Sequence, residues 1–71
     1  MEILVFKTNI RYKKHLVDLF PHLNNRKGIL RWNVDLQDKD KILRIEANGL
    51  QPQLVETVVK DAGYYCEELK D

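Results

Sequence analysis

The sequence is poor in cysteine, proline and glycine, and each scarcity excludes a class of protein. Cys66 is the only cysteine, so no disulfide can form within the chain and an extracellular, disulfide-stabilised domain gains no support. Two prolines and three glycines are too few for a fibrous or low-complexity chain. We therefore expect an ordinary globular protein located in the cytoplasm.

Net charge and long apolar runs are also scarce. Twelve basic and eleven acidic residues leave a formal net charge of +1, far from the basic excess of a dedicated nucleic-acid binder. The apolar run Ile3–Phe6 ends at Lys7, which is too short for a signal peptide or a membrane span. The sequence thus predicts no nucleic-acid partner and no membrane insertion.

The residues that are present predict six secondary-structure elements. Seventy-one residues, 44% of them apolar, suffice for one core, so residues 1–71 are expected to form a single domain. Alternating apolar residues predict strands over 2–8, 30–36, 42–47 and 64–69, and helical spacing predicts helices over 12–23 and 52–62. Pro21 should kink the first helix or end it near Phe20.

The order of these elements predicts the fold class. Because crossovers within a sheet are right-handed, the two strand–helix–strand halves are expected to form an α+β, ferredoxin-like βαββαβ sandwich. It would have a four-stranded antiparallel sheet with both helices on one face. The open face would carry charged residues beside four apolar ones, namely Leu4, Phe6, Ile29 and Ile42. Such a mixed face suits protein contact or self-association better than RNA binding.

Several landmarks resemble the heavy-metal-associated domain family, which includes metallochaperones and N-terminal modules of metal-transporting ATPases. They are Lys7-Thr8-Asn9 at the end of the first strand, Gly28-Ile29 before the second, and Ala62-Gly63-Tyr64 after the second helix. The resemblance covers almost the whole chain and implies the same ferredoxin-like fold.

The metal loop of that family is altered here. It reads Met-x-Cys-x-x-Cys and holds a soft ion such as Cu(I) between two thiolates. Asn9 and Tyr12 stand at the positions of the two cysteines, and neither an amide nor a phenol is a useful ligand for a soft ion. We therefore expect a degenerate domain without a metal or other cofactor, which acts through protein contacts.

Cys66, His15 and His22 are alternative ligands for a transition metal ion. The histidines are seven positions apart, about 10 Å along a straight helix, so they cannot share an ion whose bonds to nitrogen are about 2 Å long. The alternative function is metal binding or trafficking through Cys66 with His15 or His22, completed by a second chain. Otherwise Cys66 is a small buried strand residue.

A basic run opens the first helix, where the helix dipole favours acidic residues. Arg11, Lys13 and Lys14 form this run, and Arg26 with Lys27 could extend it. It indicates an interaction surface for an acidic protein partner, with an ordinary solvated face as the alternative.

Two further expectations concern the loop at residues 9–12. Tyr12 and Tyr64 are expected to pack together in place of a metal site. A small-molecule regulatory domain, with a pocket near residues 9–12, is a third possible function. No nucleophile stands beside a base and there is no Gly-rich phosphate loop, so we expect no enzymatic activity.

Overall fold

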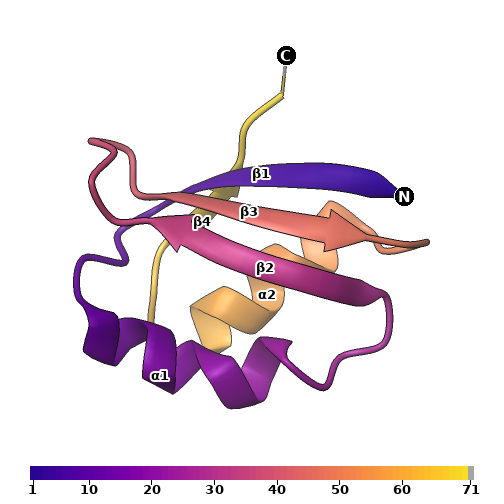
Figure 1. Ribbon diagram of the computed structural model, residues 1–71, viewed down its shortest axis with the longest axis horizontal. Helices are drawn as coiled ribbons and strands as arrows, with labels where there is room; N and C mark the ends of the chain where they lie inside the picture. The colour runs from indigo at the N-terminus through magenta and orange to yellow at the C-terminus, as the bar shows by residue number, and fades with distance from the viewer. Residues whose placement is uncertain (71) are drawn as a thin grey trace.

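The computed structural model describes residues 1–70 as one four-stranded sheet covered by two helices. The elements are β1 (Glu2–Thr8), α1 (Lys13–Leu23), β2 (Ile29–Asp35), β3 (Ile42–Ala47), α2 (Pro52–Asp61) and β4 (Cys66–Glu68). Both helices lie on the same face of the sheet (Figure 1). The predicted βαββαβ fold class is therefore confirmed.

The strands follow the order β2-β3-β1-β4, and every neighbouring pair is antiparallel. β1 is thus a central strand, as its apolar residues on both faces predict. β4 pairs with β1 only from Phe6↔Glu68 to Thr8↔Cys66, so it is shorter than the predicted strand over 64–69. β2 and β4 form the two edges of the sheet.

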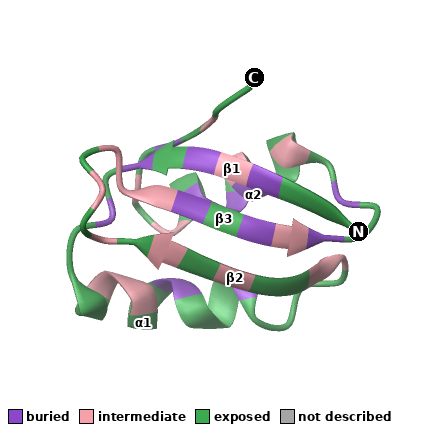
Figure 2. Cartoon of the chain, turned by 45° about the horizontal axis from the view of Figure 1, so that its top comes forward, coloured by how far each residue is buried: buried purple, intermediate pink, exposed green. Residues whose placement is uncertain are grey.

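The prediction for the open sheet face is wrong for three of its four apolar residues. Leu4 lies opposite Ile45 and Phe6 opposite Leu43, and residues opposite each other point to the same face. Leu4 and Phe6 are therefore buried under the helices, as Figure 2 shows by the buried segments of β1. Ile29 also packs against the core.

The core between sheet and helices contains nine fully buried large side chains. They are Phe6, Ile10, Leu19, Leu23, Leu43, Ile45, Val55, Val59 and Cys66. On the opposite, open face, Ile3 is 48% exposed and Val5 is half-buried.

α1 does not end near Phe20 but continues past Pro21 to Leu23. Pro21 lies in the last turn, where it removes a single intrahelical donor, and the Asn24 N–H closes that turn on the Phe20 carbonyl at 2.8 Å. Buried Leu19 and Leu23 fix the helix to the core. α1 has eleven residues and α2 ten, and no helix within residues 1–70 is long and apolar enough to cross a membrane.

β2 departs from its predicted alternation at its first residues. The register shifts between Ile29 and Arg31, which makes Leu30 the extra residue of a β-bulge. Leu30 is consequently 61% exposed, although it begins the alternation of apolar residues that predicts a strand over 30–36. Trp32 and Val34 are only partly buried against the core.

Candidate functional site

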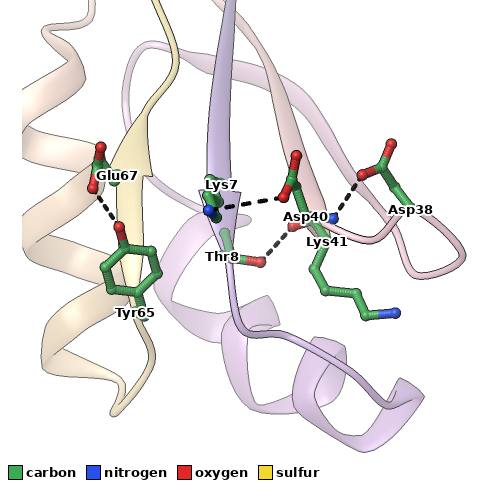
Figure 3. A network of polar contacts seen from close by, with 7 residues as sticks. All are labelled: Lys7, Thr8, Asp38, Asp40, Lys41, Tyr65 and Glu67. Atoms are coloured by element: carbon green, nitrogen blue, oxygen red, sulfur yellow. Dashed lines mark hydrogen bonds and ion pairs between the residues drawn. The ribbon is translucent and has the colours of Figure 1, made fainter.

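Thr8, the last residue of β1, anchors the loop between β1 and α1. The Thr8 hydroxyl donates to the Lys41 carbonyl at 2.5 Å and accepts the Ile10 N–H at 3.2 Å, and Figure 3 shows it pointing toward the β2–β3 turn. Ile10 itself is fully buried. The loop is therefore held on one side by the turn and on the other by the core.

Asn9 fastens the same loop to the chain entering β4. Its Oδ1 accepts the backbone N–H of Tyr65 at 2.9 Å. The amide thus has a structural role at the position where the resemblance places a cysteine ligand. Sequence reasoning missed this bond, since no local pattern marks a partner 56 positions away.

His15 caps the start of α1. Its Nδ1 accepts the backbone N–H groups of Arg11 at 3.1 Å and of Tyr12 at 3.4 Å. These are N–H groups near the start of the helix that lack a carbonyl partner within it. Because Nδ1 accepts, the neutral ring carries its proton on Nε2. Neither nitrogen then offers a free lone pair to a metal unless the cap is broken.

The two loop-side tyrosines do not stack directly, because His15 lies between them. Its ring centroid is 5.2 Å from that of Tyr12 and 5.1 Å from that of Tyr64. The Tyr64 hydroxyl donates to Asp18 at 2.9 Å. Partial burial raises the pKa of Tyr64, and this hydrogen bond to Asp18 raises it further. An aromatic cluster therefore covers the start of α1.

Cys66 is a core residue. It lies opposite Thr8 at the start of β4 and is 1% exposed. Burial raises the pKa of its thiol to about 12, to which the charge of Glu56 contributes, while Lys60 acts in the opposite direction. Only the thiolate is a good metal ligand or nucleophile, so this side chain is inert as it stands.

The three candidate ligands are not assembled into a metal centre. His22 lies near the far end of α1, where its carbonyl accepts Arg26 Nε at 3.3 Å. Within residues 1–70, no group of three or more His, Cys, Asp or Glu side chains is arranged to hold a metal ion. His15 and Cys66 also have structural roles of their own in the cap and the core.

The basic residues form two clusters rather than one surface. Arg11, Lys13 and Lys14 are exposed around the loop, and the Lys14 ammonium lies 5.7 Å from the centre of the Tyr12 ring, within cation–π range. Arg26 and Lys27 follow the other end of α1, whose eleven residues span about 16 Å. Within residues 1–70, none of the five forms an ion pair.

A shallow polar hollow of about 360 Å³ adjoins the loop. It is lined by Thr8, Asn9, Arg11, Tyr12, Lys39 and Lys41. Lys41 directs its ammonium to the Leu36 carbonyl at 2.7 Å. Lys7, near the end of β1, pairs with Asp40 in the β2–β3 turn at 3.8 Å (Figure 3). The hollow lies where a small-molecule pocket was expected, although its lining is cationic and polar rather than apolar.

Comparison with known proteins gives a consistent fold. No family model matches the sequence, and no match was found among curated proteins. The yeast copper transporter domain Ccc2a has a TM-score of 0.83 at 15% identity, with 100% of this chain and 99% of that chain covered. The first domain of the human copper chaperone CCS has a TM-score of 0.78 at 17% identity, with 93% of this chain and 89% of that chain covered. The fold is that of the heavy-metal-associated domains. The resemblance in the sequence is thereby confirmed at the level of the fold.

The same comparison overturns the expectation of no cofactor. The similar structures are copper domains, among them Ccc2a and CCS in Cu(I)-loaded forms and the copper-binding domain of HMA7, so the fold points to a metal ion rather than to none. The loop nevertheless lacks a Cu(I) donor set, because the Asn9 oxygen is engaged and the Tyr12 phenol is a poor ligand for a soft ion. Any metal would need other residues.

One of the similar structures is a complex between two proteins. The Atx1–Cu(I)–Ccc2a complex is similar to this chain with a TM-score of 0.82 at 15% identity, covering 100% of this chain and 99% of that one. A scaffold of this kind is therefore known to present a surface to a protein partner.

Proposed function

We propose that this chain is a protein-docking module of the heavy-metal-associated fold, which binds an acidic partner through the loop and the first turn of α1. The observation that carries the proposal is the set of cations Arg11, Lys13 and Lys14 around exposed Tyr12, which form no ion pair within residues 1–70. Tyrosine and arginine are enriched among the residues that contribute most to protein interfaces.

The anchored loop favours such binding. Thr8, Asn9 and His15 hold its backbone through hydrogen bonds to residues on both sides, so little conformational entropy is lost when a partner docks. The cations would chiefly accelerate encounter with an acidic surface. Arg26 and Lys27 would contact only a partner long enough to reach the other end of α1.

The similar structures support this proposal, since one of them is a complex between Atx1 and Ccc2a. Others are described as copper transporter and chaperone domains rather than as enzymes. We accordingly infer a non-catalytic role for residues 1–71 acting as one domain in the cytoplasm.

Charge reversal at the two ends of α1 tests the proposal. Cell proteins captured by the unmodified chain are compared with those captured by the Arg11→Glu/Lys14→Glu variant and by the matched Arg26→Glu/Lys27→Glu variant. We expect specific acidic partners to be retained by the second variant and their affinity to fall about tenfold or more in the first. An identical set of partners for all three chains would contradict the proposal.

Metal binding is a second candidate function, and the copper-binding neighbours favour it. The chain would have to expose Cys66 and combine it with His15 or His22, with further ligands from a second chain. Burial of Cys66 and the cap made by His15 both oppose this rearrangement. Metal would then bind only at the cost of local unfolding.

Titration of Cu(I) under reducing conditions, against a chelating competitor, distinguishes the two candidates. Metal binding through the proposed ligands requires one equivalent that is lost in the Cys66→Ser variant. Binding that persists in this variant would exclude Cys66 as a ligand. The capture experiment is independent of this titration, because Arg11 and Lys14 are not candidate ligands.

A further inference from the structure

The two edges of the sheet differ in how they are protected. Native sheets shield their edges by short strands, charges or proline, since an open edge can pair with another strand. β4 has three residues, two of them glutamates. β2 has seven residues, Ile-Leu-Arg-Trp-Asn-Val-Asp, with neither proline nor lysine. Its protective features are the bulge at Leu30 and the charges of Arg31 and Asp35. None of the seven residues is fully buried (Figure 2), so the longer edge is the more open of the two.

Apolar surface accompanies this edge. A hollow of about 400 Å³ separates α1 from β2 and is lined in part by Leu16, Phe20 and Trp32. Phe20 is 55% exposed and Leu30 61%, on the helix and the strand that border the hollow. Such a group of exposed large apolar residues beside an open strand is typical of an interface.

The side chains of β2 are complementary to a second copy of β2. In an antiparallel pair centred on Asn33, Arg31 lies opposite Asp35 of the second copy, and Trp32 lies opposite Val34. Arg31 and Asp35 point to the open face, and Trp32 and Val34 to the core face. Opposite charges therefore meet on the open face and apolar side chains meet on the core face, and both kinds of contact stabilise a strand pair.

This complementarity depends on the register. A shift by one residue would place apolar side chains of one copy opposite polar side chains of the other. A shift by two residues keeps the faces but separates Arg31 from Asp35. Arg31 lies only 3.6 Å from Glu46 of its own chain, yet its side chain is 76% exposed. Asp35 uses Oδ1 for the Gln37 N–H, which leaves Oδ2 for the second copy.

We propose that two copies of this chain associate through antiparallel pairing of β2 with β2, with Asn33 at the two-fold axis. The arrangement is isologous, as most homodimer interfaces are, and joins the two sheets into one. α1 lies alongside β2 on the core side (Figure 1), so the two α1 helices become neighbours. Phe20 and Leu30, which line the hollow between helix and strand, then lie near the joined edge in both copies.

Charge reversal with cross-rescue tests the proposal. Sedimentation equilibrium from the micromolar range to about 1 mM gives the dimer dissociation constant, and Trp32 emission reports on burial at the interface. We expect the constant to rise about tenfold in Arg31→Asp and in Asp35→Arg, because each places like charges opposite each other. An equimolar mixture of the two variants should restore association to within about threefold of the unmodified chain.

Two further variants complete the experiment. Arg44→Asp makes the same charge change beside Asn33, but on β3, away from the edge, and should alter the constant by less than about twofold. Leu30→Asp, at an exposed bulge residue, should weaken association as strongly as Arg31→Asp. This variant tests the proposal if circular dichroism shows that Arg31→Asp or Asp35→Arg is unfolded. A chain that stays monomeric at all concentrations, or a dimer insensitive to Leu30→Asp, would overturn the proposal. So would folded charge variants that fail to rescue each other.

Discussion

His15 occupies a position at which glutamate or glutamine usually completes a helix cap. Its ring accepts two backbone N–H groups at the start of α1, and loss of such a cap costs about 1 kcal/mol. His15→Ala should therefore lower the free energy of unfolding by about that amount, whereas His15→Gln, which can reach back to the same N–H groups, should retain most of it. Urea unfolding followed by circular dichroism measures both changes.

His22 provides the control for this prediction. It lies exposed on the same helix, and no side-chain hydrogen bond of His22 is found within residues 1–70. His22→Ala should change the free energy of unfolding by less than about 0.5 kcal/mol. Equal losses in His15→Ala and His22→Ala would show that helix propensity, rather than the cap, explains the effect.

The buried thiol of Cys66 should make stability fall in alkaline solution. Burial raises its pKa from 9.0 to about 12 in the folded chain, so the folded state favours the protonated thiol. The protonated thiol contributes fully to the free energy of unfolding below pH 9. This contribution is lost as the pH rises toward 12, by up to about 1.4 kcal/mol per pH unit. The stability difference between the unmodified chain and Cys66→Ala should therefore shrink between pH 8 and pH 10.

Comparison with Cys66→Ala removes the pH dependence of stability that all other groups contribute equally to both proteins. Urea unfolding of both proteins at several pH values supplies the measurement. A difference that stays constant with pH would mean that the thiol is accessible to solvent in the folded chain, and Cys66 would return as a candidate ligand.

For single residues, the sequence predicts which metal ligands are missing better than it predicts which contacts take their place. Asn9 and Tyr12 reveal the missing thiolates directly, since residue identity alone decides whether a soft ion has ligands. The new bond of Asn9 involves Tyr65, 56 positions away, and only the folded chain brings them together. His15 is an intermediate case, because its position three residues after Tyr12 is that of the partner residue in a capping box.

The connection into β2 depends on Gly28. Its φ is +96°, and a Cβ there would lie 3.3 Å from Leu50 Cδ1 and 3.4 Å from the Asn48 carbonyl oxygen. Gly28→Ala should thus combine backbone strain of about 1 kcal/mol with crowding of a buried leucine. We expect a loss of about 2 kcal/mol in the free energy of unfolding.

Gly49 separates these two causes. It also has a positive φ, +70°, but nothing lies within 4 Å of a Cβ built on it. Gly49→Ala should show the backbone strain alone, about 1 kcal/mol. Thermal or urea unfolding of both variants tests the difference, and equal losses would contradict a packing role for Gly28.

Elements were predictable where one physical signal dominated. β1 has apolar residues on both faces, which correctly indicates a central strand but cannot tell which face meets the helices. For α1, Pro21 predicts a kink or an end near Phe20. The helix does not end there, because burial of Leu23 and closure of the last turn by Asn24 outweigh one lost hydrogen bond. The β2 bulge at Leu30 reflects pairing with β3 and has no local signature.

For the whole molecule, a net charge near zero hides local groups of like charge. The formal charge is only +1, yet basic residues surround the loop and the start of α1, whereas Glu67 and Glu68 lie on β4. Net charge therefore argues against a dedicated nucleic-acid binder without describing either group of charges. The fold could be predicted from periodicity, but the partner could not, because it depends on how side chains are grouped in space.

The two sheet edges should differ in amide exchange. β1 and β3 are hydrogen-bonded on both sides and β2 on one side, so every second amide of β2 faces solvent in a single copy. If β2 pairs with a second copy, exchange of these amides should slow as protein concentration rises through the dissociation constant, by a factor that follows the dimer fraction. Exchange of the outward-facing amides of β4 should not change with concentration, since this short acidic edge has no partner in the arrangement and its Glu68 N–H already donates to Glu56 Oε2 at 2.8 Å. Concentration-dependent protection in β4, or none in β2, would place the contact elsewhere.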